Sequence, residues 1–254
     1  MDRTHTSTYP GTRFPGMGTR ALQPTCAQCR KALSEGGTGS GHCVYMEQVV
    51  THRRRVKQGA VLYNGGDPFT GLLYVRSGFF KTCVGAKDGR EQVTGFHMTG
   101  DILGVEGISG GKLTTNAVAL EDSEVWVLSF DLIEQFSREC SSLRIYLLET
   151  IGHEVVRMQN LTLMLGSLRA DERVAVFLTN LLEKLKSRGL SQSEVLLRMS
   201  RDEIGSFLGI RQETVSRLLR SFCEERILQV DNRHIKVLNS ALLQQMATSQ
   251  TAMH

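Results

Sequence analysis

The sequence predicts an α+β fold with three parts: an N-terminal β-roll, a long helix and a C-terminal winged helix-turn-helix. Short apolar runs separated by glycines fill residues 45–130, a pattern typical of strands joined by tight turns. Apolar residues then recur at helical spacing across residues 131–168. Two short helical patterns around Gly209, followed by two further strand-like runs, occupy residues 169–245.

Residues 1–44, ahead of the predicted roll, are rich in Thr, Gly, Pro and Ser. Such a composition cannot bury enough apolar surface to offset the entropy lost on ordering. We therefore expect a flexible, cysteine-containing segment unless a bound group ties its cysteines together.

Five runs of strand length predict the roll itself. They are VLYN, LLYVRSG, FFKTCV, EQVTGFH and EVWVLS, at residues 61–64, 72–78, 79–84, 91–97 and 124–129. Glycine-containing turns separate most of them, so an antiparallel roll or barrel is the expected arrangement.

The helix over residues 131–168 carries an apolar stripe, and no proline follows Pro68 to interrupt it. A stripe on a helix that projects from a roll usually packs against a partner, so we expect a homodimer. The alternative is that the stripe packs on its own subunit. The residues expected at the dimer interface are Leu147, Ile151, Met158, Leu161 and Leu165.

Residues 200–220 carry the most specific pattern in the chain. Ser200 is a good N-cap for a helix over 201–208, Gly209 supplies a turn, and a second helix begins near Arg211. Gly205 is small enough for the two helices to approach closely. The side chains expected between the helices are Ile204, Leu208, Ile210, Val215 and Leu218.

The second helix presents Glu213, Ser216, Arg217 and Arg220 on one face, because their spacing is i, i+3, i+4 and i+7. Arg can donate two hydrogen bonds to guanine, Glu can accept from cytosine, and Ser can approach either base edge. This face therefore predicts binding to double-stranded DNA, with Arg211 and Thr214 as further contacts. Two apolar runs around Asp231 and Asn232 predict a β-wing beside the helices. The alternative is a solvated amphipathic helix in an unrelated bundle.

The formal net charge of +4 is unevenly distributed, since residues 1–60 and 169–238 are basic and residues 61–168 are acidic. A basic C-terminal part fits nucleic-acid binding without proving it. No apolar run is long enough for a membrane span, and the N-terminus does not read as a secretory signal, so we expect a cytoplasmic protein.

Four segments between residues 53 and 239 form a recognisable set: RSGFFKT, EQVTGFHMTGDILG, ADERVAVFLTNL and MSRDEIGSFLGIRQETVSRLLRSF. On these segments about three-quarters of the chain resembles the Fnr-like branch of the Crp/Fnr family of bacterial transcription regulators. The resemblance implies a cyclic-nucleotide-binding-like roll, a dimerisation helix and a winged helix-turn-helix.

The resemblance also implies a function: regulation of transcription, with activation through RNA polymerase, in anaerobic or nitrogen-oxide metabolism. In this branch the recognition-helix pattern E-x-x-S-R reads TTGAT half-sites, and Glu213, Ser216 and Arg217 match that pattern. A two-fold dimer would then bind the palindrome TTGAT-N4-ATCAA.

The resemblance also bears on what the roll could sense. The family's cyclic-AMP binders hold the cyclic phosphate with an arginine, and their Glu, Arg and Ser positions fall here on Val105, Thr115 and Asn116. The missing cation argues against cyclic AMP as the ligand.

The Fnr-like oxygen sensors of the family hold a 4Fe-4S cluster on three N-terminal cysteines and one in the roll. Cys26, Cys29 and Cys43 lie in the expected N-terminal region, but Trp126 occupies the fourth position, and tryptophan cannot ligate iron. Three alternatives stay open: an iron–sulfur cluster with an atypical fourth ligand such as Cys83, a zinc or transient metal site that includes His42, and no metal.

Two rival functions are weaker. A small-molecule-binding regulatory module would not need the DNA-reading face. An enzyme could use His97, Asp101 and Glu106 as an acid–base set, but no nucleophile accompanies them, so we expect no enzymatic activity. Cys140 and Cys223 lie in predicted amphipathic helices and are expected to be structural.

Overall fold

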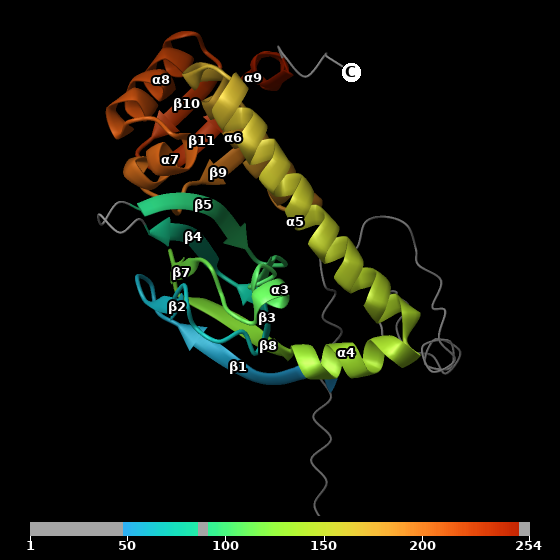
Figure 1. The fold of residues 1–254 in the computed structure, drawn as a ribbon. Coiled ribbons are helices and arrows are strands. Elements are labelled where there is room, and N and C mark those ends of the chain that lie inside the picture. Colours follow the sequence, from blue (N-terminus) through green and yellow to red (C-terminus); the bar gives the residue numbers. More distant parts are fainter. Residues whose placement is uncertain (1–47, 86–90, 249–254) are drawn as a thin grey trace, which may run out of the picture.

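The computed structural model describes residues 48–85 and 91–248, and its N-terminal part is a roll of two four-stranded antiparallel sheets (Figure 1). The first sheet has the order β1 (Val50–Val56), β8 (Ser123–Ser129), β3 (Gly71–Ser77), β6 (Ile102–Leu103). The second has the order β2 (Val61–Tyr63), β7 (Asn116–Ala119), β4 (Phe79–Gly85), β5 (Glu91–Met98). A short helix, α3 (Gly107–Gly110), lies between β6 and β7 in the chain.

All five strands expected from the sequence are present, as β2, β3, β4, β5 and β8. The sequence reading missed β1, whose residues Thr51 to Arg55 are all exposed. A strand with no buried alternation gives no period-2 signal, and β1 is held instead by its backbone pairing with β8 at the sheet edge. The side chains of Val75, Phe80, Ala117 and Val125 are fully buried in the core of the roll.

Two helices, not one, follow the roll. Helix α4 (Phe130–Glu139) and helix α5 (Ser141–Ser167) are separated by Cys140, whose backbone is extended with φ −116° and ψ 99°. The expectation of a single helix over 131–168 is therefore wrong at Cys140. The reason is packing: Cys140 is fully buried with Leu143 and Trp126, so the chain turns there to place α4 and the start of α5 against the first sheet.

The C-terminal part is the winged helix-turn-helix that the sequence predicts. Its elements are α6 (Ala170–Ser187), β9 (Glu194–Leu196), α7 (Arg201–Leu208), α8 (Gln212–Glu224), β10 (Leu228–Asp231), β11 (His234–Val237) and α9 (Ser240–Thr248). Strands β10 and β11 form the wing, and β9 adds a third strand that was not expected. The wing turn is Asn232–Arg233, one residue later than predicted, because Asp231 pairs with His234.

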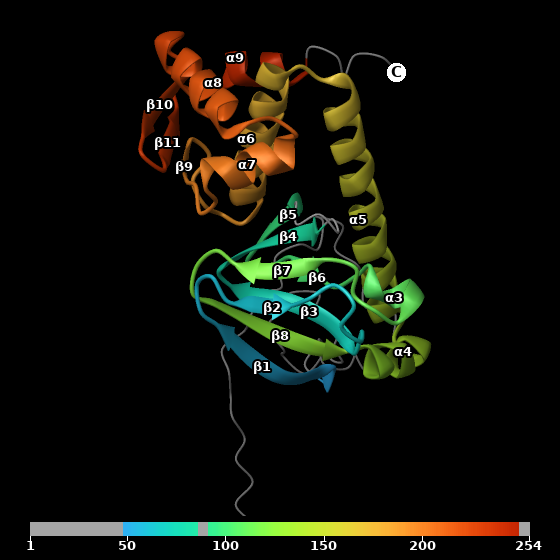
Figure 2. The same ribbon diagram turned by 60° about the vertical axis from the view of Figure 1, so that its left-hand side comes forward.

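The long helix α5 runs past the roll to the helix-turn-helix, which sits directly above the roll (Figure 2). The two parts share one apolar cluster, in which Phe79 and Met98 of the roll pack with residues of α6, α7 and α8. Ser206 of α7 also joins the edge of β5, accepting from the amide of Val93 at 2.9 Å and donating to the carbonyl of Glu91 at 3.1 Å. Within the described residues, no helix is long and apolar enough to cross a membrane.

Candidate nucleic-acid interface and sensor pocket

Local capping fixes the start of the first helix of the motif. The hydroxyl of Ser200 accepts a hydrogen bond from the amide of Glu203 at 3.1 Å, and the Glu203 carboxylate accepts from the amide of Ser200 at 2.7 Å. This reciprocal capping box satisfies two amides that the helix itself leaves without partners. The helix ends at Gly209, which has the left-handed φ of 64° that favours glycine.

Gly205 sets the distance between α7 and the turn that follows. A Cβ atom at this position would lie 2.6 Å from the carbonyl oxygen of Ile210 and 3.3 Å from the amide of Gln212. The close approach predicted from the sequence is therefore present. Of the predicted inward residues, Ile204, Leu208 and Val215 are buried, whereas Ile210 and Leu218 are half-buried.

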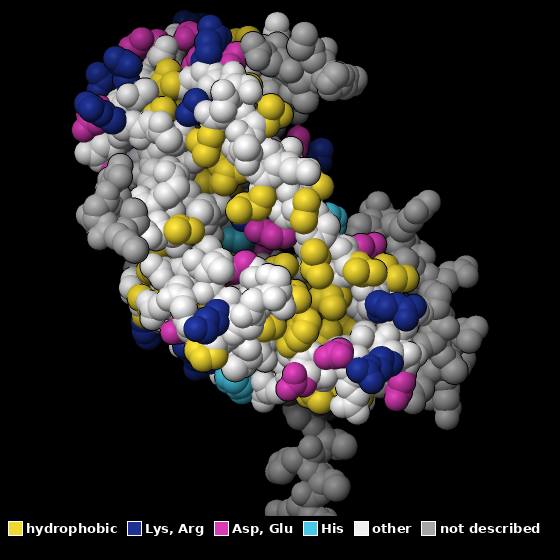
Figure 3. All heavy atoms as spheres, viewed as in Figure 1, with side chains coloured by type: hydrophobic (Ala, Val, Ile, Leu, Met, Phe, Trp, Pro, Cys, Tyr) yellow, Lys and Arg dark blue, Asp and Glu magenta, His cyan; other side chains and the backbone are white. Residues whose placement is uncertain are grey.

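The outer face of α8 carries the side chains predicted to read DNA. Glu213, Ser216, Arg217 and Arg220 are all exposed, opposite the buried Val215, Leu219 and Phe222. Lys and Arg side chains gather over this end of the molecule, around α8 (Figure 3). Within the described residues, neither Arg217 nor Arg220 forms an ion pair, so both guanidinium groups are available to a ligand. Arg211 is exposed at the N-cap of α8, and Thr214 is half-buried.

Two further cations of the DNA-binding part, Arg201 and Arg233, were not singled out from the sequence. Arg201, at the start of α7, donates to the carbonyl of Asn232 in the wing turn at 2.9 Å. Desolvation and the neighbouring charge of Arg233 lower the pKa of Arg201. Two like charges beside each other favour an anion such as a DNA phosphate. Only the folded wing brings them together, since they are 32 positions apart in the chain, so no local pattern could have revealed them.

The apolar stripe of α5 differs from the predicted one. Leu147 packs on the roll cluster, and Leu161 and Leu165 pack on the helix-turn-helix cluster, so each of the three is half-buried within its own subunit. Met158 is exposed and Ile151 is half-buried. The large apolar side chains that α5 does expose are Leu148 (61%), Val155 (51%), Val156 (53%), Met158 (45%) and Leu163 (57%).

A shallow open groove of about 760 Å³ runs along part of this exposed stripe. Val155, Met158 and Leu163 contribute its apolar surface, and Gly166 lies at the end towards the helix-turn-helix. Because α5 contacts its own subunit on one side at both ends, the exposed face includes Met158 but otherwise differs from the residues that spacing alone selected.

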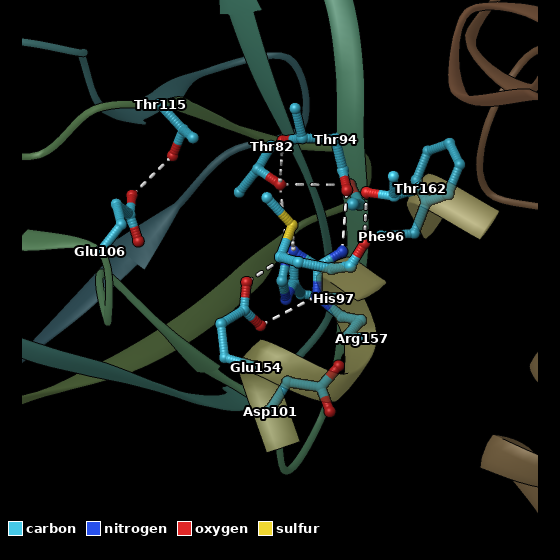
Figure 4. A network of polar contacts seen from close by, with 12 residues as sticks. Thr82, Thr94, Phe96, His97, Asp101, Glu106, Thr115, Glu154, Arg157 and Thr162 are labelled. Carbon is cyan, nitrogen blue, oxygen red and sulfur yellow. Dashed lines mark hydrogen bonds and ion pairs between the residues drawn. The ribbon is translucent and has the colours of Figure 1, made fainter. Parts of the chain in front are cut away.

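The roll contains a small polar pocket between the sheets and α5 (Figure 4). Its volume of about 140 Å³ is below the roughly 300 Å³ at which pockets for drug-sized ligands begin. Glu106 occupies it and accepts a hydrogen bond from Thr115 at 2.7 Å. Burial, and after it the charge of Glu106, raises the pKa of the neighbouring Tyr63. A carboxylate here disfavours a cyclic phosphate.

The expectation that no cation reaches this pocket needs correction, because α5 supplies one. Arg157 lines the pocket, but two of its nitrogens donate to Glu154 at 2.9 and 2.6 Å, and a third donates to the carbonyl of Thr94 at 2.8 Å (Figure 4). Its charge is therefore already balanced. His97 lies beside it with Nε2 3.1 Å from the Thr82 hydroxyl, and burial lowers the pKa of His97 to about 3, which keeps the ring neutral.

Asp101 joins the roll to α6 through two ion pairs of 2.5 Å, one with Lys184 and one with Arg188. Burial raises the pKa of Asp101, but the charges of Lys184 and Arg188 outweigh it, so the net effect is a lowered pKa. The three residues considered as an acid–base set therefore have separate structural partners: His97 has Thr82, Asp101 has the α6 cations, and Glu106 has Thr115.

The predicted metal ligands Cys26, Cys29 and Cys43, together with His42, lie outside the described residues. Trp126 is on β8, 9% exposed, with its indole Nε1 donating to Glu124 at 3.1 Å. Cys83 is fully buried on β4, and desolvation raises the pKa of its thiol. Among the residues that the structure describes, no group of three or more His, Cys, Asp or Glu side chains could hold a metal ion.

Comparisons with known proteins match both parts of the fold. A cyclic nucleotide-binding domain model matches residues 53–140, and a Crp-like helix-turn-helix domain model matches residues 172–246. The transcriptional regulatory protein btr of Bordetella pertussis is 34% identical over 230 residues, 89% of this chain and 95% of that protein. The transcriptional activator protein anr of Pseudomonas aeruginosa is 34% identical over 205 residues, 81% of this chain and 84% of that protein. The structure of FixK2 from Bradyrhizobium japonicum superposes with a TM-score of 0.70 at 28% identity, covering 77% of this chain and 96% of that one.

Proposed function

Since the chain belongs to the Crp/Fnr family of DNA-binding transcription regulators, which are not enzymes, we propose that it binds a TTGAT-N4-ATCAA-like palindrome as a homodimer. One α8 helix would enter the major groove of each half-site. The observation that carries this proposal is the outer face of α8, where Glu213, Ser216 and Arg217 are exposed together on a rigidly built helix-turn-helix.

The proposed roles follow from the chemistry of each side chain. Arg217 donates a bidentate pair of hydrogen bonds to the guanine of TTGAT, Glu213 accepts from the opposing cytosine, and Ser216 lies against a neighbouring A·T pair. Arg220, Arg211 and Thr214 contact the flanking bases or phosphates. Arg201 and Arg233 lie beside the wing turn and add phosphate contacts that fix the register without reading sequence.

The family typically dimerises, and the exposed stripe of α5 supports a two-fold interface for this chain. In a symmetric dimer the same patch faces itself, so apolar side chains at Leu148, Val155 and Met158 would each be covered by the partner helix. Leaving such a stripe in water is unfavourable by about 25 cal/mol for each Å² of apolar surface. The five dimer contacts expected from the sequence stay part of the proposal; Met158 is exposed, and the other four are half-buried in the single subunit: Leu147, Ile151, Leu161 and Leu165.

The experiment is a binding titration on three duplexes at fixed salt, since affinity for DNA depends on salt. We expect the intact palindrome to bind tightly and a scrambled duplex to bind weakly. A palindrome with five base pairs added to the spacer should also bind weakly, because the insertion rotates one half-site by about half a helical turn. Equal affinity for all three duplexes would contradict sequence-specific recognition by a two-fold dimer.

We further propose that the bound dimer activates transcription by contacting RNA polymerase, and that the regulated genes serve anaerobic or nitrogen-oxide metabolism. Because its DNA target would be the chromosome, the protein would act in the cytoplasm. The Pseudomonas relative is named a transcriptional activator, and this supports activation over repression. In vitro transcription with purified RNA polymerase tests it. More transcript from a promoter with an upstream TTGAT palindrome supports activation, and less transcript indicates repression.

Direct sensing of cyclic AMP is not part of the proposal, because Glu106 and Thr115 occupy the roll pocket where a phosphate would need a cation. A 4Fe-4S cluster does not fit the roll either. Trp126 occupies the fourth ligand position, and its indole N–H cannot ligate iron and already donates a hydrogen bond to Glu124. We therefore propose DNA binding that needs no cluster. Purification with and without oxygen, with iron assayed in both samples, tests this. Binding confined to an anoxic, iron-containing sample would overturn it in favour of an atypical fourth ligand.

A further inference from the structure

A second and larger cavity lies where the roll, α5 and the helix-turn-helix meet. Its volume is about 360 Å³. The volume falls within the range of small-molecule sites, which occur preferentially at domain interfaces. It is distinct from the polar pocket of the roll that holds Glu106 and Thr115.

Aromatic side chains from three elements form the apolar end of this cavity. Phe96 of β5 has ring-centroid distances of 6.0 Å to Phe177 of α6 and 5.3 Å to Phe207 of α7, and the latter two rings are 5.9 Å apart. Met164 and Leu181 complete this end. The rings meet at tilted or edge-on angles, and a planar ligand ring would add contacts of the same kind.

The other end is polar and adjoins a neighbouring hollow of about 330 Å³. The two hollows share His153, Arg157 and Lys184, and we treat them as an apolar lobe and a polar lobe of one site. Lys184 and Arg157, which line both hollows, have side chains 34% and 29% exposed, so an acceptor on a ligand can reach their charged groups. Hydrogen bonds from charged donors are stronger than those between neutral groups, so this end favours a ligand that supplies an acceptor.

We propose that this two-lobed cavity binds a small amphipathic molecule, with an aromatic body of one or two rings in the apolar lobe and a carboxylate or carbonyl acceptor in the polar lobe. Arg157 and Lys184 are already paired with Glu154 and Asp101. The acceptor therefore adds to a balanced set of charges and does not replace a missing partner.

The position of the cavity couples such a ligand to DNA binding. Its walls come from the roll (Phe96), from α5 (Met164) and from both α6 and α7 of the DNA-binding part (Phe177 and Phe207). Phe207 lies two residues before the turn at Gly209, so a ligand that contacts it acts on the placement of the helix-turn-helix. A ligand that prefers one placement must change DNA affinity, and DNA must change ligand affinity by the same factor.

The test uses the full chain and 1-naphthoate, a two-ring carboxylate, as the probe. We expect one probe per chain and a weaker interaction with 1-methylnaphthalene, which has no acceptor. Val176 lines the apolar lobe and Asn180 is exposed at its rim, so Val176→Phe should fill the lobe and Asn180→Trp should block it. Val61→Phe is the matched control, because Val61 is exposed on β2, away from the cavity. Asn180→Trp keeps the test valid if Val176→Phe fails to fold.

Loss of probe affinity by about tenfold or more in either cavity variant, with Val61→Phe unchanged, supports the site. Unchanged affinity in a folded cavity variant overturns it. In the wild-type chain, saturating DNA should change the probe dissociation constant by about fivefold or more, and no change overturns the coupling. Because probe binding is first measured without DNA, failure of the site is distinguishable from failure to bind the proposed palindrome.

Discussion

Replacing Asp101 by Asn should weaken the junction between the roll and the DNA-binding part. The Asp101 carboxylate is 14% exposed and holds both Lys184 and Arg188 at 2.5 Å. It also accepts from the amide of Met98 at 2.9 Å, which closes the turn after β5. Asparagine keeps the size and one acceptor oxygen but removes the charge.

The magnitude follows from how little water reaches the group. Breaking a buried ion pair by removing one partner costs about 3–5 kcal/mol, because the remaining charge stays buried. The Arg188 side chain is only 11% exposed and cannot easily turn to solvent, whereas that of Lys184 is 34% exposed and can. Because only Arg188 would stay buried without its partner, we expect a loss near the lower end of that range, about 3 kcal/mol in the free energy of unfolding.

Urea unfolding of the wild type, Asp101→Asn and a control variant measures this loss of stability. The dependence of the unfolding free energy on urea concentration must be the same in all three, so that the urea midpoint reports stability. The control is Asp122→Asn, which removes a Lys57 ion pair of similar length, 2.6 Å, with side chains that are 85% and 63% exposed. We expect no measurable change in the control. A loss below about 1 kcal/mol for Asp101→Asn, or equal losses for both variants, would refute the argument from burial.

Three further predictions concern the core, the motif and the interface. Stability should fall as the pH drops from about 6.5 towards 3, because an unfolded histidine binds a proton with a pKa near 6.5 whereas the pKa of folded His97 is about 3. His97→Gln should therefore lose less stability than wild type between pH 7 and about 4.5, a range still above the pKa of an ordinary aspartate; equal urea midpoint shifts would contradict this. Gly205→Ala should destabilise by about 1–3 kcal/mol through overpacking, whereas Gly110→Ala, with no atom within 4 Å of its Cβ, should not; thermal unfolding of both distinguishes them. Val155→Glu should raise the dimer dissociation constant by about tenfold or more in sedimentation experiments, because it places like charges across a two-fold axis; the same change at Val61, which is equally exposed, should leave it unaltered.

Local chemistry made the helix-turn-helix predictable. Ser200, Gly205 and Gly209 each have one main physical reason to stand where they do: a cap, a close approach and a left-handed residue. Alternating apolar runs likewise located five strands of the roll. These features depend on neighbours within a few residues, and such short-range patterns are visible in a single sequence.

Features that depend on tertiary contacts were not predictable. Cys140 interrupts the long helix because it packs under α4, and Leu161 faces the subunit's own core because the helix-turn-helix folds back on the roll. Period alone gives an apolar stripe but not its partner. The pairing of Arg201 with the wing turn and the cavity beside Phe207 also require the assembled chain.

The most direct test of the account is a double-mutant cycle, in which Arg217 and the G·C pair of TTGAT are changed separately and together. Wild type and Arg217→Ala are titrated at one salt concentration on the palindrome and on a duplex with that pair changed to A·T in both half-sites. The account predicts that wild type loses about 1–3 kcal/mol per changed pair, and that Arg217→Ala, already weakened, no longer distinguishes the duplexes. If Arg217→Ala weakens both duplexes equally and still prefers the G·C pair, Arg217 contacts phosphate and the assigned reading of DNA by α8 is wrong.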